Sequence, residues 1–130
     1  MEASGTTLTQ IFGIGPILAA RIIGTVGNVA RFPTKAHFAS YSGTAPVEAS
    51  SGEVVRHRLS VLGNRKLNYA LHMVATSHAR SDARGSAYYR KKIAEGKSRK
   101  EALRCLKRRV ADAVFRSLVA DSQAALRGAA

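Results

Sequence analysis

Positive charge is concentrated in one part of this chain, and that concentration limits the folds the chain can adopt. Residues 54–109 contain sixteen Lys and Arg residues and three acidic residues, whereas the rest of the chain contains five of each kind. Charged side chains are rarely buried without a partner, so the apolar residues among these cations must gather on one face of each element. A chain of 130 residues with 45% hydrophobic residues is the size of one domain. We therefore predict a single, mainly α-helical domain.

The charge also restricts the classes of partner. A formal net charge of +13 favours a polyanion, either nucleic acid or an anionic membrane surface. No apolar run approaches the roughly 18–20 residues of a spanning helix, and the opening MEASGTTLTQ lacks both parts of a signal peptide. Cys105 is the only cysteine, which rules out an intrachain disulfide and a cysteine-based metal site. We predict a nucleic-acid-binding protein of the cytoplasm, associated with the nucleoid, with no membrane partner and no metal ligands.

The first organised segment is LTQIFGIGPILAARIIGTVG, residues 8–27, after a start at 1–7 that we predict to be disordered. Gly13 and Gly15 bracket a tight turn, and Pro16 suits the first position of a helix because its missing N–H needs no partner there. The segment resembles a helix-hairpin-helix motif, in which backbone N–H groups at the hairpin bind a phosphate. The alternative is a compact turn between helices with no ligand.

Two contrasting patterns follow. Residues 32–43 predict a short helix that Thr34 caps and Gly43 ends. Apolar and basic residues then alternate with a period of two, which predicts a short extended arm or β-hairpin around residues 53–62.

The remaining pattern predicts a bundle of three longer helices over residues 64–120. Residues 65–80 place apolar side chains on one face after an Asn64 cap. Two further helices follow, separated by a break near Gly96. An S-x-x-E capping box predicts that the second of them begins at Ser98. The sequence GKS at this break differs from a nucleotide-binding loop because no strand precedes it. We predict a frayed tail over residues 121–130.

Five motifs in a fixed order carry a family resemblance over about residues 8–118: GIGPILAARIIG, RFPTKAHFASYSGTAP, SSG, GNRKL and YYRKKIAEGKS. Together they resemble the carboxy-terminal domain of the bridge-RNA-guided, serine-dependent insertion-sequence transposases. The resemblance implies a DNA recombinase that acts in DNA transposition through a serine–phosphodiester intermediate. It also implies DNA, a guide (bridge) RNA and further copies of the transposase as partners.

Full-length members of that family add an amino-terminal domain of the Holliday-junction-resolvase type, with four acidic residues that bind divalent metal. In this chain only Glu2 precedes Glu48 among the acidic residues. We therefore expect Mg²⁺ only for that additional domain and no cofactor in this chain, and we expect the chain to be a truncated copy or a fragment of a transposase that is inactive alone.

The resemblance assigns the nucleophile to Ser51, directly before a glycine in the loop and basic arm over residues 44–63, with Ser50 as the alternative. The base is left open, with His57 as a candidate proton acceptor. Glu48 and Glu53 flank the serines and are the alternative to our prediction of no metal ligands, since two carboxylates there could bind Mg²⁺. The residues that we predict to bind nucleic acid are Gly13, Gly15, Arg56, Arg58, Arg65, Lys66, Arg90, Lys91, Lys97, Lys107 and Arg108.

Three other functions compete with the serine transposase. A non-enzymatic helix-hairpin-helix module would bind DNA or RNA through its backbone without sequence preference. A basic RNA-binding domain would prefer RNA. A tyrosine recombinase would use Tyr88 or Tyr89, but its arginine and histidine constellation is missing, so we interpret these tyrosines as core or stacking residues.

Overall fold

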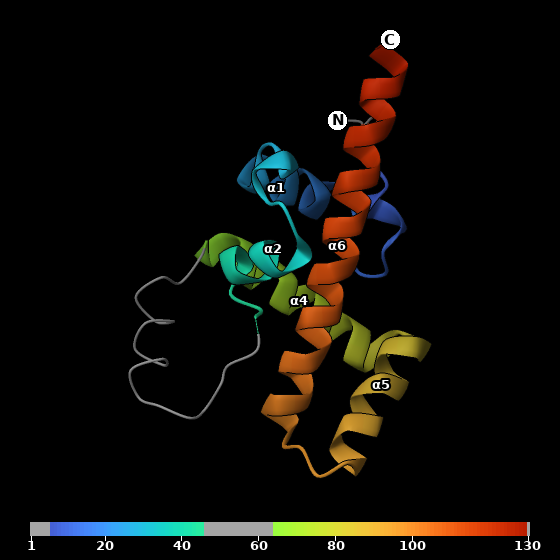
Figure 1. Cartoon of the computed structure of the whole chain (residues 1–130). Helices are drawn as coiled ribbons and strands as arrows, with labels where there is room; N and C mark the ends of the chain where they lie inside the picture. Colours follow the sequence, from blue (N-terminus) through green and yellow to red (C-terminus); the bar gives the residue numbers. More distant parts are fainter. Residues whose placement is uncertain (1–5, 46–63, 130) are drawn as a thin grey trace, which may run out of the picture.

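The computed structural model of the chain describes residues 6–45 and 64–129, and within them it contains five α-helices, two short 3-10 helices and no strand (Figure 1). The prediction of a mainly α-helical fold is therefore confirmed. The predicted extended arm around residues 53–62 lies outside the described residues. In chain order the elements are η1 (Leu8–Gln10), α1 (Pro16–Val26), η2 (Val29–Arg31), α2 (Lys35–Ser42), α4 (Arg65–Ser81), α5 (Ala83–Ala94) and α6 (Arg99–Ala129).

The helices begin where local capping chemistry predicts. The Thr34 side chain accepts a hydrogen bond from the backbone of the α2 first turn, and Asn64 does the same for α4. At the start of α6, the Ser98 N–H donates to Glu101 Oε1 at 2.8 Å and the Glu101 N–H donates to Ser98 Oγ at 3.2 Å. This reciprocal pair is the predicted capping box. Asp82, which caps α5, was not predicted from the sequence.

The start of the chain matches the helix-hairpin-helix pattern only in part. Gly13 adopts a φ of 86°, as the tight turn requires, and Pro16 opens α1. In the described residues, however, the segment before the turn contains only the three-residue η1, whose Leu8 is fully buried in the core. The hairpin is therefore flanked by one α-helix rather than two.

The core forms along one side of α6, which runs the length of the molecule in Figure 1 and packs against α2, α4 and α5. Its buried residues recur at helical spacing. On α2, the fully buried Phe38 ring lies 5.4 Å from the Phe32 ring and 5.4 Å from the Phe115 ring, centroid to centroid. The buried stripe of α6 consists of Ala102, Leu106, Val110, Ala111, Val114 and Leu118.

Both ends of the described chain are more ordered than the sequence predicts. The Thr7 N–H donates to Asp121 Oδ2 at 2.8 Å, and the Thr7 hydroxyl lies 2.5 Å from that of Ser117, so residue 7 is tied to α6. Helix α6 continues to Ala129 through the segment predicted to fray. Alanine, glutamine, leucine and arginine favour a helix there, although Leu126 remains 71% exposed and contributes nothing to the core.

Two glycines of α1 should respond in opposite ways to alanine. Gly24 lies inside the helix, and a Cβ there would meet no atom within 4 Å, so we expect Gly24→Ala to stabilise the fold by about 0.5–1 kcal/mol through helix propensity. Gly27 ends the helix at a φ of 68°, so Gly27→Ala should destabilise by about 1 kcal/mol or more. Urea denaturation of both variants measures this, and equal shifts of the same sign would contradict it.

Candidate nucleic-acid interface

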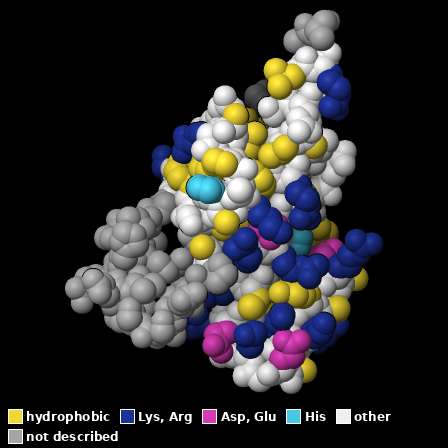
Figure 2. Space-filling view, viewed as in Figure 1, with side chains coloured by type: hydrophobic (Ala, Val, Ile, Leu, Met, Phe, Trp, Pro, Cys, Tyr) yellow, Lys and Arg dark blue, Asp and Glu magenta, His cyan; other side chains and the backbone are white. Residues whose placement is uncertain are grey.

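A strongly basic cavity of about 490 Å³ lies between the first half of α6, the end of α2 and α5. Five of its eleven lining residues are cations and one is acidic. Figure 2 shows many Lys and Arg side chains over the middle and lower part of the molecule, with acidic side chains interspersed among them. We call this cavity the basic pocket; its lining is Gly43, Thr44, Ala45, Tyr88, Lys97, Glu101, Arg104, Cys105, Lys107, Arg108 and Arg109.

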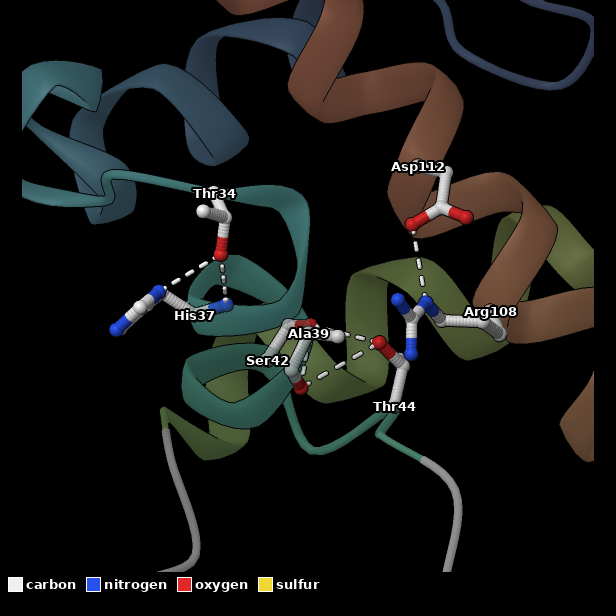
Figure 3. Close-up of polar contacts among 7 residues, drawn as sticks. All are labelled: Thr34, His37, Ala39, Ser42, Thr44, Arg108 and Asp112. Atoms are coloured by element: carbon white, nitrogen blue, oxygen red, sulfur yellow. Dashed lines mark hydrogen bonds and ion pairs between the residues drawn. The ribbon is translucent and has the colours of Figure 1, made fainter.

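Helical spacing brings most of these cations together. Arg104 precedes Lys107 and Arg108 by three and four positions, so the three side chains leave α6 on one face. Arg108 is steadied by Asp112, whose Oδ1 lies 3.0 Å from its Nε (Figure 3). The Arg109 guanidinium stacks over the Tyr88 ring at 4.3 Å from its centroid. These contacts hold the cations in place and leave the pocket strongly positive.

Lys107 joins the pocket to α4 and α2 through one amide. Its Nζ donates to Asn68 Oδ1 at 3.0 Å, and the Asn68 Nδ2 donates to the backbone carbonyls of Ser42 at 2.9 Å and Gly43 at 3.2 Å. Gly43 has a φ of 75°, and a Cβ there would lie 2.4 Å from Asn68 Nδ2, so only glycine permits this approach. Partial burial, with Arg104 nearby, holds the pKa of Lys107 below its usual value. A bound phosphate would reverse that effect.

The turn after α2 forms one wall of the pocket. The Thr44 N–H donates to the Ala39 carbonyl at 2.8 Å, and the Thr44 hydroxyl lies 3.0 Å from that of Ser42 (Figure 3). On the other side of the segment 46–63, the Asn64 N–H donates to the Tyr41 carbonyl at 2.7 Å. The two points where that segment joins the described structure are therefore both held at the end of α2.

The structure brings together only some of the residues predicted to bind nucleic acid. Lys97, Lys107 and Arg108 line the basic pocket, whereas Arg90 and Lys91 are exposed on α5 and do not line it. The remaining predictions in the segment 46–63 lie outside the described residues: Ser50, Ser51, Arg56 and Arg58, with the candidates Glu48, Glu53 and His57.

The two glycines of the hairpin and the two cations of α4 lie at different places. Gly13 packs against Ser77, 3.3 Å from where its Cβ would be, and Gly15 precedes α1. Arg65 and Lys66 occupy the first turn of α4. Arg65 precedes Ser77 by twelve residues, so the two residues are about 18 Å apart along the helix axis. The hairpin and this first turn are therefore separate surfaces.

Sequence reasoning missed Arg104 and Arg109 as pocket residues. Arg104 was detectable, because it stands one helical turn before the predicted Lys107 and Arg108. Arg109 was not, because its place depends on the distant Tyr88 ring. Tyr88 and Tyr89 are half-buried against the core, in agreement with their interpretation as core or stacking residues.

Two further classes of site can be examined in the described residues. Within residues 6–45 and 64–129, no three His, Cys, Asp or Glu side chains are grouped so as to hold a metal ion. The GKS sequence follows helix α5, not a strand, and Ser98 caps α6, so it does not form a nucleotide-binding loop.

None of the described helices combines the length and hydropathy needed to cross a membrane.

Comparison with known proteins identifies relatives. The family described as "Transposase IS116/IS110/IS902 family" matches residues 5–90. The "Insertion element IS110 uncharacterized 43.6 kDa protein" of Streptomyces coelicolor is 37% identical over 112 residues, and the "Insertion element IS116 uncharacterized 44.8 kDa protein" of Streptomyces clavuligerus is 31% identical over 107 residues. These matches cover 85% and 82% of this chain but only 28% and 27% of the relatives. No solved structure matches.

The Asn68 amide should be worth more to the fold than other polar side chains of α4. We expect Asn68→Leu to destabilise the chain by about 2 kcal/mol, because it leaves two carbonyls and the Lys107 ammonium without their partner. Thr76→Ala is the matched control: its recorded hydrogen bond is local to α4, so its effect should stay within about 0.5 kcal/mol. Urea denaturation compares the two, and similar small effects would contradict this role of Asn68.

Proposed function

The chain belongs to the IS116/IS110/IS902 family of transposases, and we propose that it acts in DNA transposition, binding DNA phosphates in the basic pocket and using Ser51 for strand transfer. The observation that carries the proposal is the convergence of five cations around one cavity, with a single acidic residue among them. Ala45, from which the chain continues to Ser51, lines the same cavity. A phosphate backbone is the partner that neutralises such a surface.

A second feature supports binding to a polyanion. Arg65 and Lys66 stand in the first turn of α4, and Arg99 and Lys100 stand in the first turn of α6. The positive end of the helix dipole disfavours cations at these places by a few tenths of a kcal/mol each. Neither arrangement improves the fold. Both suit an external anion that meets the helix N-terminus and the cations together.

The proposed chemical step is a transesterification. The Ser51 hydroxyl attacks a backbone phosphorus, a serine–phosphate ester forms, and the bond to one deoxyribose oxygen breaks. The proton released by Ser51 passes to that leaving oxygen. A hydroxyl of another strand then attacks the ester and releases Ser51. One phosphodiester replaces another, so no energy source is consumed, and the guanidinium groups of the basic pocket would stabilise the charge of the pentavalent state.

The family resemblance also implies a guide RNA, further copies of the transposase and a metal-binding domain, and these belong to the same proposal. The proposal therefore concerns a protein about three times as long as this chain, since the 112 matched residues cover 28% of the relative. A non-enzymatic DNA-binding module is the second candidate, because the basic pocket alone would suffice for it. The two functions differ only in the need for Ser51.

Binding to duplex DNA should depend on salt through the basic pocket. Each phosphate contact contributes about 0.9 to the steepness with which log K of binding falls against log salt concentration. The double variant Lys97→Gln with Arg104→Gln should therefore make this fall shallower by about 1.8. The control variant Lys35→Gln with Arg127→Gln removes the same charge outside the pocket and should leave the slope nearly unchanged. Fluorescence anisotropy at several salt concentrations measures both. Equal losses in the two variants would show that only net charge matters.

Ser51 decides between the enzyme and the binding module. With the metal-binding domain and guide RNA supplied in trans, we expect the chain to form a covalent adduct with DNA of the element end, visible as a shifted band after denaturing electrophoresis. Ser51→Ala should abolish the adduct and leave salt-dependent binding intact. Ser50→Ala is the matched control and should retain the adduct. An adduct that survives Ser51→Ala and is lost in Ser50→Ala would move the nucleophile to Ser50, and no adduct from the unaltered chain would contradict the enzyme.

A further inference from the structure

A second surface lies on the side of α4 that faces α1. The two helices enclose a groove of about 480 Å³, which we call the α1–α4 groove. Leu18 and Ile22 of α1 and Met73 of α4 contribute apolar walls, and Arg21 and Lys66 contribute one cation from each helix. The described residues that line it include no acidic side chain.

Tyr69 gives this groove its particular chemistry. Its side chain is 63% exposed, although a tyrosine ring is one of the largest apolar groups in the chain, and the neighbouring Met73 is 45% exposed. On α4 the ring is flanked by Lys66, three residues earlier, so an aromatic face and an ammonium group share one stretch of helix surface. The core does not use this ring: Tyr69 is absent from the buried cluster and from the residues packed against it.

From this combination we propose that the α1–α4 groove binds an unpaired DNA strand, with a base stacked on Tyr69 and the flanking phosphates at Arg21 and Lys66. An exposed aromatic ring between cations is the arrangement by which proteins hold single strands, since every unpaired base offers a flat face. Duplex DNA cannot use it, because its base faces are already stacked. The inference rests on the proposed function, which makes DNA the substrate.

Charge selects among the possible occupants. A second copy of this chain would bring its own net charge of +13 against Arg21 and Lys66, which opposes association through this face. A nucleic-acid strand brings the opposite sign and a planar apolar group in every repeat. The site can also extend, because Arg21 borders a further hollow with Pro16 and Ile17 at the start of α1. A strand that occupies both hollows would run toward the hairpin at Gly15.

The groove contains a position at which it can be filled without damage to the fold. Gly24 lines it and is helical, and a Cβ at Gly24 would meet no atom within 4 Å. A larger side chain at Gly24 therefore has room to occupy the groove. Gly128 is also helical with open space around its Cβ, but it lies near the end of α6 and does not line the groove. It provides a matched control.

The test measures the affinity of the full chain for a fluorescein-labelled dT12 strand and for a duplex of equal length. Tyr69→Ala should weaken dT12 binding about five- to a hundred-fold, and Tyr69→Phe, which keeps the ring, should remain within about three-fold of the unaltered chain. Gly24→Leu should weaken dT12 binding at least about five-fold, whereas Gly128→Leu should not. Duplex binding should change less than about two-fold in all four variants, since the basic pocket is intact. Circular dichroism confirms that each variant is helical.

A chemical readout locates the strand directly. A dT12 strand with one 5-iododeoxyuridine should crosslink on irradiation to the peptide that contains Tyr69. Unchanged dT12 affinity in Tyr69→Ala with no such crosslink would overturn the proposal and leave the groove to a protein segment. A larger effect of Tyr69→Ala on an rU12 strand than on dT12 would overturn it in favour of RNA. Loss of duplex binding in the pocket variants, with dT12 binding independent of Tyr69, would refute this inference alone; failure of the unaltered chain to bind duplex would refute the proposed function.

Discussion

The apolar stripe of α6 is the contact on which the rest of the structure depends. Leu106, Val110 and Val114 lie one turn apart and bury the same face of the helix against α2, α4 and α5. Because the buried face of α6 is fixed, the directions in which its other side chains leave the helix are fixed as well. Arg104 and Arg108, also one turn apart, must emerge on another face, where they line the basic pocket. The packing that folds the chain therefore also orients the cations that line the basic pocket.

Local chemistry predicted most of the fold. The caps at Thr34, Asn64 and Ser98 were correct because a cap involves residues only three positions apart, whose side chains and N–H groups meet whenever the helix forms. The sequence did not predict the length of α6 or the order of Thr7. Those two features support each other across more than a hundred residues, through a hydrogen bond to Asp121 that no local pattern encodes. The same limit applies to the hairpin, which rests on α4 through the His78 contact with the Phe12 carbonyl.

The candidate site was predictable to a smaller extent. Charge density indicated the half of the chain that supplies every cation of the basic pocket, and helical spacing grouped Lys107 with Arg108. The pocket itself depends on contacts between distant residues: Asn68 reaches Lys107 across 39 positions and the Gly43 carbonyl across 25. The residues next to Asn68 in the sequence do not predict these contacts. Ser51 is a different case, since small residues around a serine are common, and only the order of motifs in a family resemblance distinguishes it.

Helix α4 connects the basic pocket with the α1–α4 groove, because it lines the groove and its Asn68 accepts a hydrogen bond from Lys107 of the pocket. Asn68, which supports the basic pocket, and Tyr69, which faces the α1–α4 groove, are consecutive residues, and consecutive side chains leave a helix about 100° apart. Strand transfer requires DNA to be paired on one side of a reacting phosphate and free to exchange partners on the other. If both proposals hold, α4 connects the two forms of DNA: Asn68 holds Lys107 of the basic pocket, and Tyr69 lines the groove.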